Sequence, residues 1–231
     1  MTWRQIAEDV VVLSFPWRAL GIDFRRNVTL LRLSDGRLLI HSTAPFSDED
    51  RAAIRAFGKP AWLVEATLMH DTFAKEGRSA FPDLPYLAPD GFTNLTGIPT
   101  QLLDAVPEDW TGEIDVIPIA GTRKNEHAFF HRRSRTLIVA DLFFSLPPET
   151  RGWPRFFAKH FMRLPRLFGI SAFFRLIIRD RVAFERSVKQ LLELDFENLI
   201  VAHWEPLVGK AKPAVEQALA DFGFAGVSRP A

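Results

Sequence analysis

The stretch Thr136–Phe144, TLIVADLFF, constrains the fold of this chain more than any other. Five apolar or β-branched residues follow one another and end at a single carboxylate, Asp141. A continuous apolar run of this length predicts a strand that is buried on both faces. An acid at the C-terminal end of such a strand lies at the rim of a sheet, which is where α/β folds place their chemistry.

Two other stretches repeat this pattern. Ala61–Asp71, AWLVEATLMHD, is a short apolar run that is followed by His70 and Asp71. Leu199–Glu205, LIVAHWE, is an apolar run that is followed by His203. Three strands that each end in an Asp or a His predict one convergent polar site.

The bulk composition fits a single α/β domain. The chain has 231 residues, 47% of them hydrophobic, which is enough for a full core in one domain or at most two small ones. The net charge of +1 creates no strong field that would attract nucleic acid. The absence of Cys excludes disulfides, thiolate metal ligands and a Cys nucleophile. Because the first residues lack the apolar region of a signal peptide and no stretch approaches a membrane span, we expect a soluble cytoplasmic protein.

Turn and capping signals predict a strand, helix, strand unit in the first half of the chain. An Asp-Gly pair separates the apolar runs Val28–Leu33 and Arg37–Ile40, which predicts a hairpin. Ser47 and Asp50 form a capping box that opens a helix, and the next strand begins soon after it. This order favours a crossover connection between parallel strands.

A second group of strands follows residue 110. Ala128–His131 and Thr136–Ala140 flank a short polar turn, which predicts another hairpin. Ser171 can cap one long helix, because apolar residues recur with helical spacing as far as Leu192. Two groups of strands predict two sheets or half-sheets.

The order of these features resembles the metallo-β-lactamase superfamily over most of the chain. The family's main motif, Thr-His-x-His-x-Asp-His after a buried strand, corresponds to Ala66–Thr72, ATLMHDT, in which only Asp71 is in register. The family's strand that ends in Gly-Asp corresponds to Ala140 and Asp141, and its final His corresponds to His203. The resemblance implies a four-layer αββα sandwich of two mixed sheets, in a divergent branch with eroded metal-binding motifs.

The resemblance also indicates which metal ligands are missing. The family's first metal site takes three His residues, and the corresponding positions here hold Thr67, Met69 and Thr122. The second site takes an Asp, a His, a bridging Asp and the final His. Three of these four positions survive, as Asp71, Asp141 and His203. The resemblance therefore implies a mononuclear or empty site in place of a dinuclear one.

The surviving residues are the candidate catalytic and metal-binding groups. Two carboxylates and one imidazole, from Asp71, Asp141 and His203, suit a single Zn, Mn or Fe(II) ion. His70 or His41 could supply a fourth ligand. The alternative is that no metal binds and that each residue is structural. The two acids would then repel each other, and one would keep a proton or pair with an arginine, for which Arg123 is the nearest candidate in the family's geometry.

Two functions follow from this resemblance. The first is a metallohydrolase-like protein with a reduced site and an unknown small-molecule substrate. The second is a non-catalytic binding or interaction protein that keeps only the scaffold. The fold alone cannot choose between them.

The segment Arg151–Arg181 differs in composition from the rest of the chain. It holds eight Lys or Arg residues and one acid, Asp180, together with one Trp and six Phe. Within a single domain spanning residues 1–231, we predict a helical insertion at about 150–181 that packs partly over the mouth of the site. It can be a pair of ordinary amphipathic helices, a homodimer contact, or a peripheral contact with an anionic membrane.

Overall fold

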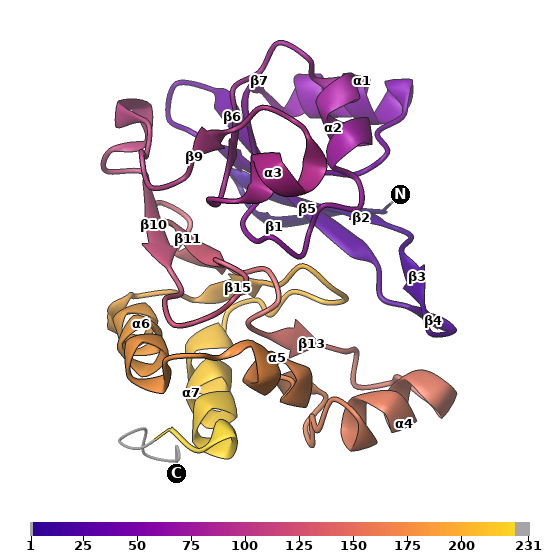
Figure 1. Ribbon diagram of the computed structural model, residues 1–231. Coiled ribbons are helices and arrows are strands. Elements are labelled where there is room, and N and C mark those ends of the chain that lie inside the picture. Colours follow the sequence, from indigo (N-terminus) through magenta and orange to yellow (C-terminus); the bar gives the residue numbers. More distant parts are fainter. Residues whose placement is uncertain (1, 225–231) are drawn as a thin grey trace.

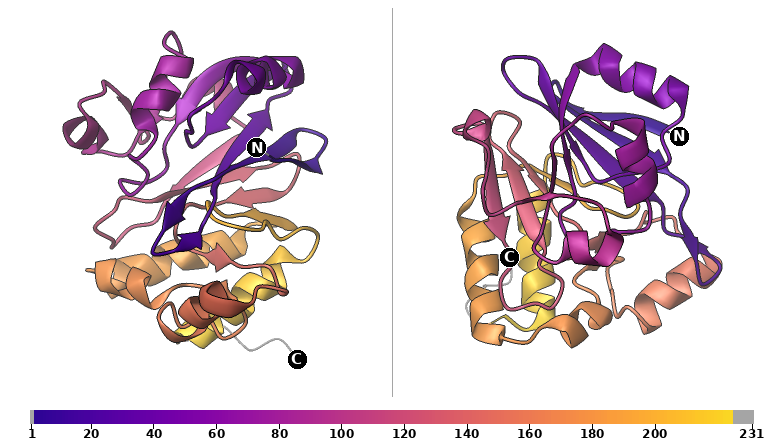
Figure 2. Two further views of the ribbon diagram at one scale, coloured as in Figure 1. Left: turned by 90° about the vertical axis from the view of Figure 1, so that its right-hand side faces the viewer. Right: turned by 45° about the horizontal axis from the view of Figure 1, so that its top comes forward.

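The computed structural model describes residues 2–224, and in it two sheets face each other between outer layers of helices (Figures 1 and 2). The first sheet has seven strands in the order β1-β2-β5-β6-β7-β8-β9. These strands are β1 (Thr2–Ala7), β2 (Val10–Phe15), β5 (Arg26–Arg32), β6 (Arg37–His41), β7 (Lys59–Val64), β8 (Tyr86–Ala88) and β9 (Gln101–Leu102). The β5–β6 hairpin is antiparallel and the β6–β7 pair is parallel, as the sequence predicts.

The second sheet contains the strand with which the sequence analysis began. Its four strands, in order, are β10 (Ile114–Pro118), β11 (His127–His131), β12 (Thr136–Ile138) and β15 (Asn198–Ile200). Strand β12 lies between antiparallel β11 and parallel β15, and its residues are at most 1% exposed. The prediction of a strand buried on both faces is confirmed, and Asp141 follows its C-terminal end.

Three apolar layers hold the sandwich together. The layer between the sheets combines Leu39 of β6 with Phe129 of β11 and Ile200 of β15. The outer face of the first sheet packs on α1 (Asp48–Phe57), α2 (Ala74–Ala80) and α3 (Phe92–Thr96). The outer face of the second sheet packs on α5 (Ala172–Ile177), α6 (Arg181–Glu193) and α7 (Ala211–Phe222). The predicted four-layer αββα fold is confirmed.

A smaller apolar cluster lies beside the sandwich and builds one wall of the site. It joins α4 (Gly152–His160) to the ribbon of β3 (Arg18–Ala19) and β4 (Ile22–Asp23), through contacts that include Phe24 and Phe157. A second ribbon pairs β13 (Phe144–Ser145) with β14 (Phe168–Gly169). A 3-10 turn at Glu108–Trp110 precedes β10. None of the helices within residues 2–224 combines the length and the apolar character that crossing a membrane requires.

The capping box predicted at the start of α1 is present. The backbone N–H of Asp50 donates to the hydroxyl of Ser47 at 3.1 Å, and the N–H of Ser47 donates to the carboxylate of Asp50 at 2.9 Å. Each bond satisfies an N–H group that has no partner within the helix. The capping box therefore begins α1 at the predicted residue and directs the chain from β6 to β7.

The prediction of one long helix after Ser171 is wrong, because the chain forms two helices. Ser171 caps α5 by accepting from the N–H of Phe174 at 3.2 Å, and Asp180 caps α6 by accepting from the N–H of Ala183 at 3.0 Å. Between them, the N–H groups of Arg179 and Asp180 donate to the carbonyl of Gly121, at 2.7 and 3.1 Å. The loop after β10 therefore captures the chain where a continuous helix would have bonded to itself.

The close approach of Gly121 to the backbone of Asp180 predicts that Gly121→Ala destabilises the fold strongly. Gly121 has φ +75°, and an added Cβ would lie 2.1 Å from the carbonyl oxygen of Asp180. We expect a loss of about 3 kcal/mol or more in the free energy of unfolding, measured by urea denaturation. Gly97→Ala is the matched control, because Gly97 has φ +73° with open space around it. It should lose only about 1 kcal/mol, and equal losses in the two variants would contradict the steric argument.

Candidate metal centre

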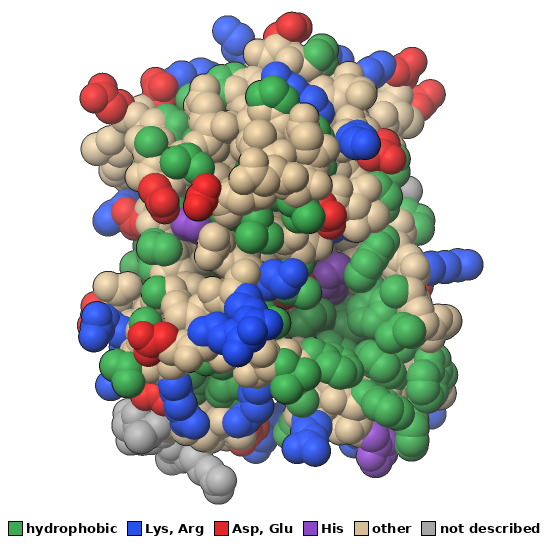
Figure 3. All heavy atoms as spheres, in the orientation of Figure 1, with side chains coloured by type: hydrophobic (Ala, Val, Ile, Leu, Met, Phe, Trp, Pro, Cys, Tyr) green, Lys and Arg blue, Asp and Glu red, His purple; other side chains and the backbone are tan. Residues whose placement is uncertain are grey.

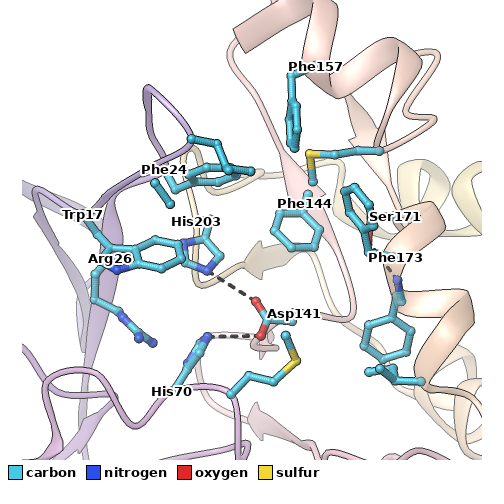
Figure 4. Close-up of a pocket in the computed structure, with 16 residues that line it drawn as sticks. Trp17, Phe24, Arg26, His70, Asp141, Phe144, Phe157, Ser171, Phe173 and His203 are labelled. Carbon is cyan, nitrogen blue, oxygen red and sulfur yellow. Dashed lines mark hydrogen bonds and ion pairs between the residues drawn. The ribbon is translucent and has the colours of Figure 1, made fainter.

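Three strand ends meet at one edge of the sandwich. His70 follows β7 of the first sheet, whereas Asp141 and His203 follow β12 and β15 of the second. One ligand atom from each residue lies within 4.8 Å of the other two, and all three side chains are buried. Figure 4 shows the carboxylate of Asp141 between the two imidazole rings. The structure thus brings together His70, Asp141 and His203, from three different strand ends.

The carboxylate of Asp141 meets one imidazole with each oxygen. Its Oδ2 lies 3.3 Å from Nε2 of His70, and its Oδ1 lies 3.3 Å from Nε2 of His203. Burial alone would raise the pKa of Asp141, but the two imidazole rings beside its oxygens outweigh burial and hold that pKa well below the ordinary value. Asp141 is therefore ionised at neutral pH.

The orientation of His203 is set by its other ring nitrogen. Nδ1 lies 2.6 Å from the carbonyl oxygen of Arg25 and must carry the proton, because a carbonyl oxygen can only accept. In the neutral ring Nε2 then presents a lone pair to Oδ1 of Asp141. Trp17 and Phe144 stack on the ring at centroid distances of 5.1 and 5.7 Å. Two acceptors held face to face in this way call for a cation between them, either a proton or a metal ion.

His70 has buried ring nitrogens that make no hydrogen bond within the described part of the chain. Its Nδ1 lies 4.0 Å from a carboxylate oxygen of Glu65. Burial, with the nearby charge of Arg26, lowers the pKa of His70 to about 4. The imidazole is therefore neutral at neutral pH, which is the form that binds metals.

Glu126 holds the backbone around Asp141, and no motif in the sequence indicates this role. This buried carboxylate accepts the backbone N–H groups of Ala140, Asp141 and Leu142, at 2.9, 3.2 and 3.1 Å. Burial and the charge of Asp141 raise the pKa of Glu126 to about 8 despite these three bonds. Glu126 fixes the chain where β12 ends and so aims Asp141 into the site.

The buried arginine of the site is Arg26, and the expectation of Arg123 is wrong because Arg123 is exposed. Arg26 is 1% exposed, lines the cavity and donates to the hydroxyl of Ser42 at 3.2 Å. Burial lowers its pKa, against the opposing effect of Glu65 and Asp141. Burial likewise raises the pKa of Glu65 to about 7, and its carboxylate accepts hydrogen bonds from Ser42 and Thr43.

Asp71 lies outside the cluster, contrary to expectation. The N–H of His70 closes a turn onto the carbonyl of Thr67 at 3.4 Å, and this turn carries His70 inward. Asp71 is exposed, and its carbonyl accepts the N–H of Ala74 in the first turn of α2. His41 is buried but also lies outside the cluster, and burial lowers its pKa to about 3. The donor set is therefore two imidazoles and one carboxylate.

A cavity of about 260 Å³ opens above the cluster. Its floor is polar and consists of Arg26, His70, Asp141 and His203, with Ser171 to one side (Figure 4). Its walls are almost wholly apolar. They are formed by Trp17, Ala19, Leu20, Phe24, Met69, Phe144, Phe157, Met162, Phe173, Phe174 and Ile177. Five of these side chains and Ser171 belong to the basic segment Arg151–Arg181, which therefore forms one side of the cavity.

Comparison with known proteins identifies the fold. No protein-family model matches the chain. No curated protein matches it by sequence either. Solved structures do match the chain in fold. A metallo-β-lactamase from Erythrobacter litoralis has a TM-score of 0.62 at 14% identity, over 91% of this chain and 92% of that one. A metallo-β-lactamase from Pontibacter korlensis has a TM-score of 0.61 at 11% identity, over 90% and 93% of the two chains. The DIM-1 metallo-β-lactamase has a TM-score of 0.59 at 14% identity, over 90% of both chains.

The role of Glu126 predicts a large effect of Glu126→Ala on stability. Removing the carboxylate leaves three backbone N–H groups buried without an acceptor, and each costs about 1–3 kcal/mol. We expect the free energy of unfolding to fall by about 3 kcal/mol or more, measured by denaturation in urea. Glu193→Ala, at an exposed acid that ends α6, is the control and should change stability by less than about 0.5 kcal/mol. Similar values for both variants would contradict this account.

Proposed function

We propose that this chain, which has the metallo-β-lactamase fold, is a metallohydrolase-like protein that binds one divalent metal ion through His70, Asp141 and His203. The observation that carries the proposal is the pair of acceptors, His203 Nε2 and Asp141 Oδ1, held 3.3 Å apart in a buried site. The unpartnered nitrogens of His70 add a third donor beside them. A divalent cation satisfies all three groups at once.

The donor set favours some metals over others. Two neutral imidazoles and one carboxylate suit Zn or Fe(II), whereas Mn prefers a larger share of oxygen ligands. Three protein ligands leave coordination positions open on the side of the cavity. Thr67, Met69 and Thr122, which stand where the family's first site has its His ligands, offer hydroxyl and thioether groups that bind such ions poorly. The proposal is therefore a mononuclear site.

The protein's own residues supply the remaining features of such a site. A bound metal would lower the pKa of a water molecule and polarise a substrate oxygen. The carbonyl of Arg25 holds the His203 ring in orientation, and Glu126 holds the backbone of Asp141. Arg26 places a buried positive charge beside the floor of the cavity, where it can bind an anionic oxygen of a substrate. The apolar walls surround these groups on the side of the cavity.

The second candidate is a non-catalytic binding protein whose site holds protons instead of a metal. The contacts of Asp141 with two imidazoles favour it, because one proton held between the carboxylate and a ring would balance the charge without any metal ion. Its cavity would bind the same kind of small molecule and would not transform it. The metal content of the protein separates the two candidates.

The proposal predicts one metal ion per chain in protein purified without a His tag. His70→Ala, Asp141→Asn and His203→Ala each remove a ligand and should abolish binding, as measured by elemental analysis and by competition with a chromophoric chelator. His160→Ala is the matched control, because His160 is exposed on α4, and it should retain the metal. Addition of EDTA should lower the melting temperature of the wild type and of His160→Ala, but not that of the three ligand variants, because a bound ion stabilises the folded state by mass action.

Stability alone does not decide between the two candidates. Asp141 pairs with two imidazoles in either case, so Asp141→Asn should destabilise the protein with or without a metal. A wild type that takes up no Zn, Mn or Fe(II) and melts at the same temperature with EDTA would support the non-catalytic protein. A metal-replete Asp141→Asn variant would refute the assignment of the ligands.

A further inference from the structure

We propose that the face around the mouth of the cavity docks on an anionic lipid surface. The docking rim consists of the exposed apolar side chains Leu20, Trp153, Phe156, Phe161, Phe173 and Leu176. This inference goes beyond the proposed function and does not depend on a bound metal. It rests on three properties of the rim, which are its exposure, its charge and its position at the cavity.

The exposure of the docking rim is unusual for aromatic residues. Trp153, Phe156, Phe161 and Phe173 are 46, 50, 50 and 48% exposed. Figure 3 shows hydrophobic side chains gathered over one region of this view, around a hollow. Contiguous apolar surface of this kind marks a site of contact with a protein or a membrane. Exposing large aromatic side chains to water costs free energy. A partner that covers the docking rim would therefore be stabilised by burying them.

The docking rim is continuous and firmly attached to the sandwich. Trp153 contacts Phe156 and Phe161 at ring distances of 5.9 and 6.1 Å, and buried Phe157 contacts Phe161 and Phe173 at 5.5 and 6.1 Å. The indole N–H of Trp153 donates to the carbonyl of Leu20 at 3.0 Å, which ties the turn between β3 and β4 to α4. The rim is therefore one preformed surface that spans three elements.

The charges around the docking rim favour an anionic partner. Arg151, Lys159 and Arg163 are exposed on the same segment and form no ion pair within residues 2–224, whereas Arg175 packs its guanidinium on Phe222 of α7. The single acid of the segment, Asp180, caps α6. Trp and Phe side chains flanked by Lys and Arg are typical of surfaces that lie in the headgroup region of anionic bilayers. A symmetric contact with a second copy of this chain would instead bring these like charges together.

The docking rim also surrounds the entrance of the cavity. Leu20 and Phe173 belong to both the rim and the cavity wall, and Phe157 connects the two. A lipid surface against the rim would therefore face the mouth of the cavity. The apolar walls above a small polar floor then fit a ligand with an apolar chain and one polar group, which passes from the bilayer into the site without crossing water.

Co-sedimentation with vesicles tests this proposal. The wild type should sediment with phosphatidylcholine vesicles that contain phosphatidylglycerol, and much less with pure phosphatidylcholine, at low salt. Phe156→Ser combined with Phe161→Ser should abolish sedimentation with the anionic vesicles, and circular dichroism should report an unchanged fold. Leu95→Ser, at an aliphatic residue that is 53% exposed on α3, is the control and should bind as the wild type does.

A second pair of variants tests the charge without altering the packing. Lys159→Gln and Arg163→Gln should each weaken partitioning roughly fivefold, whereas Lys75→Gln, at an exposed residue of α2, should not. Equal binding to neutral and anionic vesicles would overturn the proposal. A dimer that forms without lipid and dissociates in the Phe156→Ser, Phe161→Ser variant would reassign the docking rim to a second copy. His70→Ala should still bind vesicles, which separates this inference from the metal site.

Discussion

The buried carboxylate of Asp141 is the interaction on which the site depends. A lone carboxylate in an apolar interior is strongly disfavoured, so its charge must be met by nearby donors or cations. His70 comes from the first sheet and His203 from the second, so the contacts of Asp141 join the two sheets at their common edge. Glu126 holds the backbone from which the carboxylate projects. The site is therefore also a structural joint, and any substitution in it acts on stability as well as on chemistry.

The charge balance of this region would link the proposed binding of a metal ion to proton release. Arg26 and Asp141 offset each other, while the pKa of Glu65 is raised to about 7 and that of Glu126 to about 8, both chiefly by burial. Both acids therefore hold protons for much of the time at neutral pH. A divalent ion beside them would favour their ionised forms and release those protons. The affinity for the ion would then rise with pH, as is general for sites with protonatable neighbours.

Local pattern in the sequence predicts two groups of strands and most of the cluster, whereas the αββα sandwich is what the resemblance to the metallo-β-lactamase superfamily implies. Apolar runs that end in His70, Asp141 and His203 identify the strand ends, and these strand ends meet at the common edge of the two sheets. The sequence pattern could not show which of the adjacent residues His70 and Asp71 belongs to the site. A turn at Thr67 decides which of the two side chains faces inward. In the sequence, Arg25 and Arg26 resemble the polar end of a loop. Only the burial of Arg26 among residues distant in sequence reveals its role. The prediction of a single long helix was wrong because of a contact between residues distant in sequence. The carbonyl of Gly121 accepts hydrogen bonds from Arg179 and Asp180 and so interrupts the helix.

His203 connects the chemistry of the site to the surface that surrounds it. Its Nε2 belongs to the polar floor, but its ring belongs to the aromatic wall, where it stacks on Phe144 with an interplanar angle of 6°. Phe144 pairs with Gly169, within the basic segment, through the β13–β14 ribbon. The same segment carries most of the docking rim, so a surface that presses on the rim acts on elements that touch His203. Because the ring is also held by the carbonyl of Arg25, a small displacement of Phe144 would change the packing of His203 before it changed the direction of Nε2. Under the two proposals, the direction of the metal-binding nitrogen of His203 would therefore depend more on the carbonyl of Arg25 than on contacts made at the docking rim.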